Sequence, residues 1–449
     1  MFRHRTSFSG GIKLAMPDRI AADAVVRQMP FAPLLRLPLR QHAGAAAVAV
    51  VRAGEEVLRG QLLARAEDET AVPLHAPATG RVVRIGEQSD GAGGTVGVIE
   101  LAPLPGDTQE QARERTFDAD RLDADELLAA IREAGIIGLG GERGPTHQRL
   151  QRARKRGVAV LVINGIEGEP GFTRVPALLA RHGSDVISGA RFLGKVLGSQ
   201  DAVLAVEKPD ANSASAMLAD SENHDRPVLA VLRPRYPQGA AELLVRTLAR
   251  RPVEGIPAFN AEKAMVFSLA TVAEIGRLLS HGLTMTDQLI TLAGDGLRDT
   301  GNYRVPLGTP VGFALAQAGA HSELDRVLDG GPMRGHALGH LDRPITKGAT
   351  GFVAMVANEQ ASLPEPMACI RCGECVAACP LQLHPAELGL LARRGEIQAM
   401  VEDWHLERCF ECGCCAYVCP SHIPLVQMFR AAKKQSRRAK ALAAGEEPA

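Results

Sequence analysis

The sequence is poor in aromatic residues and has no excess of charge of either sign. Its 449 residues include one Trp and three Tyr, and 51 basic residues balance 51 acidic ones. Proteins that bind single-stranded nucleic acid stack bases on aromatic side chains, and all nucleic-acid binders need a basic surface. We therefore expect no nucleic-acid partner.

No long hydrophobic run occurs either. The longest apolar stretches, 45–51 and 158–163, have the length of strands, whereas a membrane-spanning helix needs about 20 apolar residues. Residues 1–5 are not followed by the apolar segment of a signal peptide. We expect an intracellular protein that reaches a membrane only through a partner or a surface patch.

Cysteine is absent from the first 368 residues, and all nine cysteines lie between Cys369 and Cys419. A secreted disulfide framework would spread its cysteines, so this pattern indicates a reducing compartment. Eight of the nine form two runs with identical spacing, each ending in Cys-Pro. The runs are Cys369, Cys372, Cys375, Cys379 and Pro380, and then Cys409, Cys412, Cys415, Cys419 and Pro420.

This spacing is typical of bacterial ferredoxins that carry two 4Fe-4S clusters, in which the fourth cysteine of each run binds the other cluster. We therefore assign Cys369, Cys372, Cys375 and Cys419 to one cluster, and Cys379, Cys409, Cys412 and Cys415 to the other. Cys414 is expected to pack beside the second cluster without binding it. A pair of structural zinc sites is the alternative, although zinc usually takes widely separated Cys-x2-Cys pairs.

The rest of the chain divides into regions with different patterns. Residues 1–102 show short alternating apolar runs broken by Gly and Pro, which predicts β-structure. Residues 118–255 alternate helix and strand patterns and predict an α/β domain. Residues 260–355 predict a small α+β module, 365–430 the cysteine domain, and 431–449 a basic flexible tail.

The local patterns also predict individual elements. Helices are expected over 123–133 and 311–318, with one or two more over 385–404. Strands are expected over 158–163 and 287–293, and a turn at Gly301-Asn302.

The first region is similar to the barrel-sandwich fold of lipoyl and biotinyl carrier domains. The similarity lies in Gly54-x-x-Val57-x-x-Gly60 and in Ala76-Pro77-x-x-Gly80. A carrier domain needs a lysine on the hairpin between these two motifs, but no lysine occurs between Leu14 and Arg154. We therefore predict a purely structural barrel.

Two further motifs follow in the α/β region. A glycine-rich turn spans 138–146 and includes Gly138, Gly140 and Gly141; it is followed by Arg149. Glycines let backbone N–H groups approach a phosphate next to a helix N-terminus, where the helix dipole favours an anion. After the strand comes 164–171, with Asn164, Glu167, Gly168 and Glu169 as candidate cofactor-binding residues.

Together with the cysteine runs, these motifs resemble the C subunit of the Rnf (Rsx) membrane electron-transport complex, which is related to the NADH-binding flavoprotein subunit of respiratory complex I. The resemblance covers nearly the whole chain and includes the stretches 38–42, 236–239 and 330–333. It implies a barrel-sandwich domain, an α/β domain that binds FMN and NADH, a β-grasp soluble-ligand-binding domain and a ferredoxin-like domain.

The resemblance also implies a setting and partners. These are the other subunits of a membrane complex, a soluble ferredoxin or flavodoxin reached indirectly, and a peripheral position on the cytoplasmic face of the bacterial inner membrane. NADH would exchange a hydride with FMN, and the clusters would relay single electrons.

The sequence departs from this family at the glycine-rich turn. Glu142, Arg143 and Gly144 stand where the family has alanine, glycine and phenylalanine, and Gly171 replaces a tyrosine that could stack on nicotinamide. Arg143 could obstruct the phosphate or help to bind it.

The alternative function is a flavin-free iron–sulfur relay in which the FMN and NADH site is inactive. We expect His42, His75 and His147 to be ordinary surface or turn residues.

Overall fold

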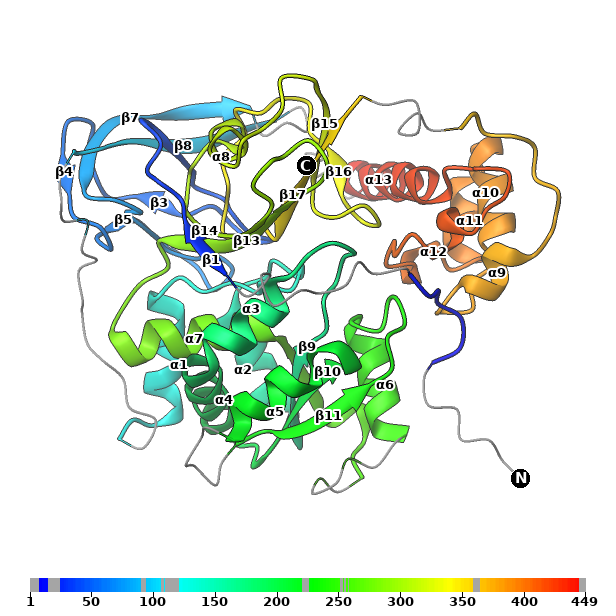
Figure 1. The fold of residues 1–449 in the computed structure, drawn as a ribbon, viewed down its shortest axis with the longest axis horizontal. Coiled ribbons are helices and arrows are strands. Elements are labelled where there is room, and N and C mark those ends of the chain that lie inside the picture. Colours follow the sequence, from blue (N-terminus) through cyan, green and yellow to red (C-terminus); the bar gives the residue numbers. More distant parts are fainter. Residues whose placement is uncertain are drawn as a thin grey trace.

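The computed structural model describes residues 8–14, 25–89, 94–105, 109, 121–219, 226–250, 253, 256, 258–357 and 364–443. Three units pack against one another, and a fourth, helical unit lies at one end of the molecule (Figure 1). Within these residues, no helix is both long and apolar enough to cross a membrane.

The N-terminal unit is built from short antiparallel strands, as predicted. One sheet has the order β2-β8-β7-β4 and the other β3-β5-β6. The strands are β2 (Leu35–Pro38), β3 (Val48–Ala49), β4 (Glu56–Val57), β5 (Leu62–Arg65), β6 (Leu74–His75), β7 (Gly80–Ser89) and β8 (Thr95–Pro103). Leu37, Leu63 and Leu101 from the two sheets are buried in one core.

The second unit has a parallel sheet of order β11-β10-β9-β12. Its strands are β9 (Val160–Gly165), β10 (Asp201–Glu207), β11 (Val228–Leu232) and β12 (Ala264–Ser268), and its helices are α1 (Ala124–Glu133), α2 (Thr146–Arg156), α3 (Arg174–Arg181), α4 (Gly183–Leu197), α5 (Ala211–Ala219), α6 (Ala241–Arg250) and α7 (Leu269–His281). Helix α1 begins where predicted because Asp123 and Glu126 form a capping box. Strand β9 lies two residues later than predicted.

The predicted end of this unit at residue 255 is wrong. Strand β12 pairs in parallel with β9, and α7 packs closely on α4, so the unit continues to His281. Gly189 and Gly276 make this helix contact possible: a Cβ atom at either position would lie within 2 Å of a carbonyl oxygen of the facing helix.

The third unit has a six-stranded sheet of order β1-β14-β13-β17-β15-β16 with one helix. Its elements are β1 (Val26–Gln28), β13 (Asp287–Ala293), β14 (Gly301–Pro306), α8 (Val311–Gln317), β15 (Leu324–Asp329), β16 (His336–Ala337) and β17 (Gly351–Val356). Strand β13 has the predicted bounds, and α8 ends one residue before the predicted helix. The predicted turn at Gly301-Asn302 is wrong, because both residues pair with β13 as the start of β14. Strand β1 leaves the predicted 1–102 domain and pairs with β14.

The helical unit contains all the cysteines. Its helices are α9 (Glu374–Ala378), α10 (Pro385–Arg394), α11 (Ile397–Glu402), α12 (Cys414–Tyr417) and α13 (Leu425–Ala443). The predicted flexible tail is wrong for residues 431–443, because these residues continue α13 and bury Ala432, Lys433 and Ser436. Residues 444–449 lie outside the described part of the chain.

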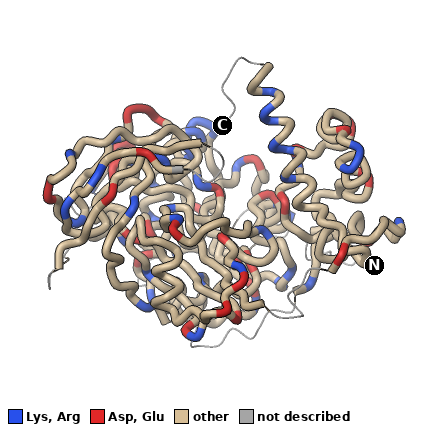
Figure 2. Tube along the Cα trace, turned by 90° about the horizontal axis from the view of Figure 1, so that it is seen from above, with Lys and Arg blue, Asp and Glu red and all other residues tan. Residues whose placement is uncertain are grey.

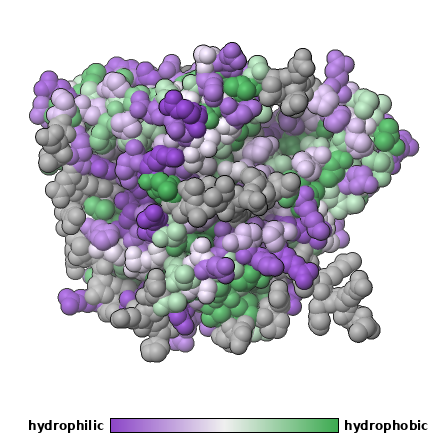
Figure 3. Space-filling model, in the orientation of Figure 1, coloured by the Kyte–Doolittle hydropathy of each residue, from purple (hydrophilic) through white to green (hydrophobic). Residues whose placement is uncertain are grey.

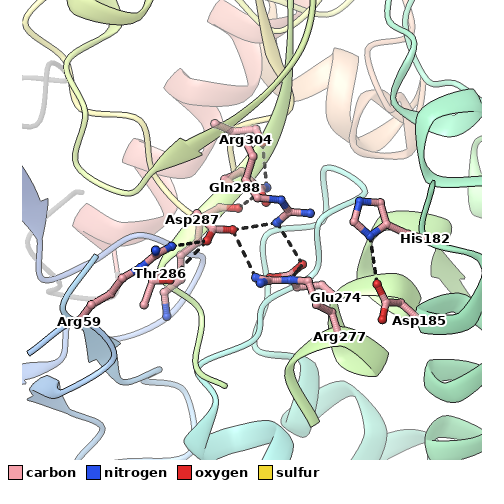
Figure 4. A network of polar contacts seen from close by, with 11 residues as sticks. Arg59, His182, Asp185, Glu274, Arg277, Thr286, Asp287, Gln288 and Arg304 are labelled. Carbon is pink, nitrogen blue, oxygen red and sulfur yellow. Dashed lines mark hydrogen bonds and ion pairs between the residues drawn. The ribbon is translucent and has the colours of Figure 1, made fainter. Parts of the chain in front are cut away.

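A buried ion network joins the first three units (Figure 4). Asp287 of β13 accepts hydrogen bonds from Arg59 of the N-terminal unit at 3.0 Å, Arg277 of α7 at 3.2 Å and Arg304 of β14 at 2.7 Å. Burial opposes ionisation of Asp287, but the three guanidinium groups outweigh it and hold its pKa below the usual range. The network therefore fixes the relative positions of the three units.

The hairpin loop between β5 and β6 is also fixed. Glu69 in this loop accepts hydrogen bonds from Arg132 at 2.9 Å and Gln151 at 3.3 Å, and its backbone oxygen accepts one from His147 at 2.9 Å. His75 and His147 are buried in β6 and α2, so the expectation of surface or turn residues is wrong for them, whereas His42 lies in a bend, although it is buried.

Charges of both signs are interspersed along most of the chain, and the exception is the helix that leads to the C-terminus (Figure 2). That helix, α13, presents exposed Lys434, Arg437, Arg438 and Lys440. On the face drawn in Figure 3, hydrophobic side chains form scattered patches among hydrophilic ones.

Candidate functional site

The two cysteine runs adopt the same backbone conformation. In the first run Arg371 and Gly373 have positive φ, and in the second run Glu411 and Gly413 do, 40 residues later in each case. Left-handed residues alternating with right-handed ones turn successive backbone N–H groups toward one side, which creates a concave site for negative charge. The repeat in the sequence is therefore a repeat in structure.

Each run contributes three cysteines to one internal space and its fourth cysteine to the other. One space is lined by Cys369, Cys372, Cys375 and Cys419. The second is lined by Cys379, Cys409, Cys412 and Cys415. These are the two sets expected from the crossing pattern of two-cluster ferredoxins.

Backbone N–H groups donate to two sulfur atoms of the second set, although burial raises the pKa of both thiols. The Cys379 sulfur accepts a hydrogen bond from the Leu383 N–H at 3.3 Å, and the Cys409 sulfur accepts one from the Glu411 N–H at 3.4 Å. Among the described residues, no group of three or more His, Cys, Asp or Glu side chains is spaced to hold a single metal ion. The two cysteine sets line two separate spaces within the helical unit.

Cys414 is fully buried and lines the second space beside Cys412. It packs together with Ile12, Tyr236 and Met333, where the helical unit meets the rest of the chain. Cys414 therefore packs beside the second set as expected, and the expectation that it binds no cluster stays a prediction.

A cavity of about 880 Å³ lies where the α/β unit, the third unit and the helical unit meet. Six of the predicted cofactor-binding residues line it: Gly140, Gly141, Asn164, Glu167, Gly168 and Glu169. Its volume is that of a typical cofactor or ligand site.

The acidic and amide side chains among these residues shape the wall of the cavity. Asn164 donates to the Gly239 carbonyl at 2.8 Å, and Glu167 accepts from the Val175 N–H at 3.1 Å. Glu169 forms an ion pair with Arg334 at 2.8 Å; burial raises its pKa despite this partner. These residues therefore hold loops of two units in place around the cavity.

Gly138 and Arg149 do not line the cavity. Arg149 is bound to Glu142, donates to the Val266 carbonyl at 3.0 Å and lies over the Phe267 ring. Burial lowers its pKa to about 10. The predicted role of Arg149 as a phosphate cation does not fit this position, and the same ion pair turns Glu142 away from the cavity.

Arg143 does line the cavity, on the side of the third unit. It packs against Gly348 and lies 4.0 Å from Asp329. A Cβ added to the neighbouring Gly141 would meet nothing within 4 Å, so Arg143 leaves the space at the turn open. Gly140 lies against Ser268, which caps α7, and the N-terminus of this 13-residue helix also lines the cavity.

Two polar side chains that were not among the candidate cofactor-binding residues also line the cavity. Within the described structure, Nε and Nη1 of Arg174 and both amide atoms of Gln238 are buried without a hydrogen-bond partner. Buried polar groups in native proteins almost always have partners. Arg174 and Gln238 therefore fit a ligand that brings an anionic group and further polar atoms.

Aromatic side chains reach the cavity from other positions than expected. Position 171, where the family has a tyrosine, is a glycine in this chain, and the cavity is instead lined by Phe172, Tyr236 and Phe410. Tyr236 also donates a hydrogen bond to the Cys412 carbonyl oxygen at 2.6 Å, and Phe410 follows Cys409 directly in the chain. The cavity is thus joined to the second cysteine set by direct contacts.

Family models match three consecutive parts of the chain. The RnfC barrel sandwich hybrid domain matches residues 6–102, the Nuo51 FMN-binding domain matches 131–277, and a 4Fe-4S dicluster domain matches 368–423. The second match ends near His281, in agreement with the observed extent of the α/β unit.

Curated relatives resemble the chain over most of its length. The C subunit of the proton-translocating ferredoxin:NAD(+) oxidoreductase complex of Clostridium ljungdahlii is 31% identical over 89% of this chain and 87% of that protein. The C subunit of the ion-translocating oxidoreductase complex of Pectobacterium carotovorum is 35% identical over 96% of this chain but only 57% of its own length. Among solved structures, an NAD+-reducing NiFe-hydrogenase aligns with a TM-score of 0.48 and 18% identity, covering 74% of this chain and 68% of that one.

Proposed function

Because the chain belongs to the family of C subunits of ion-translocating oxidoreductase complexes, we propose that it is the electron-transfer subunit of such a complex. It would exchange electrons with NADH at a bound FMN and pass them through two 4Fe-4S clusters. The observation that carries this proposal is the large cavity. It holds Gln238 and the Nε and Nη1 atoms of Arg174 without hydrogen-bond partners, and it directly adjoins the second cysteine set.

The proposed cluster ligands are the two crossed cysteine sets. Cys369, Cys372, Cys375 and Cys419 would hold one cluster, and Cys379, Cys409, Cys412 and Cys415 the other. Iron–sulfur clusters exchange single electrons at potentials set by hydrogen bonds and solvent exposure. The N–H groups of Leu383 and Glu411 supply such hydrogen bonds to the second set.

FMN, when bound, would take up a hydride and release the two electrons one at a time. In this chain, Gly140 and Gly141 give the cofactor close access to backbone, and Arg174 supplies a cation for its phosphate or for that of the dinucleotide. Gln238 can donate and accept hydrogen bonds to its polar atoms. Phe172 and Tyr236 exclude water from this side of the cavity.

Contacts in the structure favour one order for the two clusters. Tyr236 and Phe410 join the cavity to the second cysteine set, whereas Cys372 of the first set is exposed to solvent. We infer that electrons move between the cavity and the second set, and between the first set and partners outside the chain.

Finer assignments belong to the same proposal. The third unit is assigned as a β-grasp module, supported by its β13–β14 hairpin, the helix α8 and the parallel pairing of β17 with β13. The chain would lie peripherally on the cytoplasmic face of the inner membrane, together with the other subunits of the complex. A soluble ferredoxin or flavodoxin would exchange electrons with it indirectly.

Flavin content and iron content test this proposal together. The purified chain should contain FMN and about eight iron atoms, as two 4Fe-4S clusters require. Anaerobic NADH should bleach the flavin absorbance and then reduce the clusters. Iron without flavin and without a response to NADH would instead establish the flavin-free relay, and zinc in place of iron would overturn the electron-transfer proposal.

A further inference from the structure

The 40-residue repeat gives the two cluster sites different surroundings. Ile370, Cys372 and Gly373 of the first run occupy the same places as Phe410, Cys412 and Gly413 of the second. The backbone conformation repeats as well. A difference in solvent exposure between two residues of a pair therefore shows that other parts of the chain cover one site and not the other.

The second run is covered by the rest of the chain. A Cβ at Gly413 would lie 2.8 Å from the Met333 carbonyl oxygen of the third unit. Cys412 and Gly413 are buried, and Phe410 lines the large cavity. This face of the second run is the contact through which the proposed flavin site meets its cluster.

The same face of the first run is open. A Cβ at Gly373 would meet nothing within 4 Å, Cys372 is exposed, and Ile370 is 68% exposed. Met367, two residues before Cys369, is 57% exposed. In Figure 1, α12 of the second run faces the other units, whereas α9 of the first run lies on the outer side.

The two runs carry opposite charges at one repeated position, Arg371 in the first run and Glu411 in the second. Glu411 of the second run is neutralised from within the chain by Arg430 at 3.1 Å and Lys433 at 3.0 Å. Its counterpart in the first run is Arg371, which is exposed and has no acidic partner in the described part of the chain. Arg393 of α10, beside the same cluster site, is also exposed and unpaired there, while Glu374 is the acidic residue of the run.

We propose that this face, centred on Ile370 and Cys372 and flanked by Arg371 and Arg393, is the docking surface for an acidic redox protein. The proposal rests on the proposed function, because it needs a cluster on the first cysteine set. The apolar centre would be covered on docking, and carboxylates of the partner would pair with the two arginines, as complementary charges do in transient electron-transfer complexes. The step is a single-electron exchange in which one protein is oxidised and the other reduced, with no bond or proton moved.

The test uses the full iron-loaded chain, with an acidic 4Fe-4S ferredoxin standing in as the probe for the acidic redox partner. Iron content and the paramagnetic spectrum of each variant are recorded first. Binding is then measured by biolayer interferometry, and electron transfer from the reduced probe by stopped-flow mixing. The variants are Arg371→Glu with Arg393→Glu, Ile370→Glu alone, and the control Arg437→Glu with Arg438→Glu on α13, which makes the same change of charge on another exposed surface.

The double variant at 371 and 393 should weaken binding and slow electron transfer about tenfold or more at low salt. Most of this difference should vanish near 0.5 M salt, where the Debye length is roughly 4 Å and more distant charges are screened from one another. Ile370→Glu should weaken binding at both salt concentrations, and the control should behave as the unmodified chain. If the two surface variants keep their clusters yet bind and react normally, or if the control loses as much, the docking surface is refuted. Absence of clusters from the unmodified chain would instead refute the proposed function.

Discussion

The hydroxyl of Tyr236 donates a hydrogen bond to the backbone carbonyl oxygen of Cys412 over 2.6 Å. Tyr236 lines the large cavity, and Cys412 belongs to the second cysteine set. Burial, aided by the nearby carboxylate of Glu169, raises the pKa of Tyr236, so the phenol remains a donor throughout the working pH range.

Tyr236→Phe should therefore slow electron transfer from flavin to cluster severalfold, because it removes the bond that fixes their separation, worth about 1 kcal/mol. Stopped-flow spectra after mixing with NADH should show normal flavin reduction and delayed cluster reduction. Tyr303→Phe is the matched control, since it removes a 2.5 Å bond to the Asp299 carbonyl in the third unit. Equal rates in both variants would argue against a role of the Tyr236 contact.

Arg174→Gln should lower the affinity for FMN or for NADH. A hydrogen bond to a charged group contributes about 1.5–3 kcal/mol, which corresponds to roughly a 10- to 150-fold increase in Kd. Fluorescence titration of the flavin-depleted protein measures the first affinity, and the NADH dependence of bleaching measures the second. Arg181→Gln, an exposed change at the other end of α3, should alter neither. Unchanged affinity for both ligands in Arg174→Gln would show that the unpartnered guanidinium is not their binding group.

Cys379→Ser and Cys419→Ser should each damage the cluster of the opposite run. Cys379 lines the space formed by the second run, and Cys419 the space formed by the first. Paramagnetic spectra of the reduced proteins should therefore lose the second-set signal in Cys379→Ser and the first-set signal in Cys419→Ser. The reverse pattern of losses would contradict the crossed assignment.

Asp287→Asn should destabilise the chain strongly, since it leaves three partly buried guanidinium groups without their shared, buried carboxylate. Removing one partner of a buried ion pair costs about 3–5 kcal/mol. The lowered pKa of Asp287 means that its contribution is complete above the ordinary aspartate pKa near 4 and is lost as pH falls through the depressed value. Urea titrations should thus show a gap between wild type and variant that is constant above pH ~4 and narrows below it. Asp299→Asn, at an exposed pair with Arg298, should change stability by less than about 0.5 kcal/mol.

Lys347 lies fully buried at the junction of three units and donates 2.7 Å hydrogen bonds to the Pro73 and Gly135 carbonyl oxygens. Burial lowers its pKa to about 7 from the usual 10.5. Between these values the unfolded chain binds the proton and the folded chain does not, so the stability of the wild type should rise with pH, by at most about 1.4 kcal/mol per unit. Lys347→Met should remove this rise, whereas exposed Lys155→Met should keep it. A wild-type stability that is flat between pH 7 and 10 would disprove the shifted lysine.

The sequence predicted those parts of the site that depend on local spacing. The cysteine runs fix their own backbone turns, and Asp123 and Glu126 fix the start of α1, so both were predictable. Arg174, Gln238 and Arg334 were missed because the cavity forms only when three units meet, and no local pattern signals that meeting. One signal was present for Arg174: a basic residue at the start of α3, closely following Glu167-Gly168-Glu169-Pro170 in the candidate binding segment.

The errors also have physical causes. The role predicted for Arg149 does not fit because its guanidinium forms an ion pair with Glu142. Glu142 is one of the residues of the turn that differ from the family. The boundary at residue 255 was wrong because β12 joins the sheet beside β9, on the side away from β10. The alternation of helix and strand patterns in a sequence does not give the order of the strands in a parallel sheet, which depends on three-dimensional packing. The tail was predicted to be flexible because it is rich in basic residues. The small residues Ala432 and Ser436, which form the buried face of the helix there, give only a weak apolar pattern.

Residues Gly11 and Ile12 form backbone hydrogen bonds with Ala378 and Tyr236, segments that are made much later during synthesis. On the ribosome, Gly11 lacks its Ala378 partner until most of the polypeptide has emerged. Closure of the helical unit onto the α/β unit is therefore a late step in assembly, and contacts of such long sequence separation form slowly.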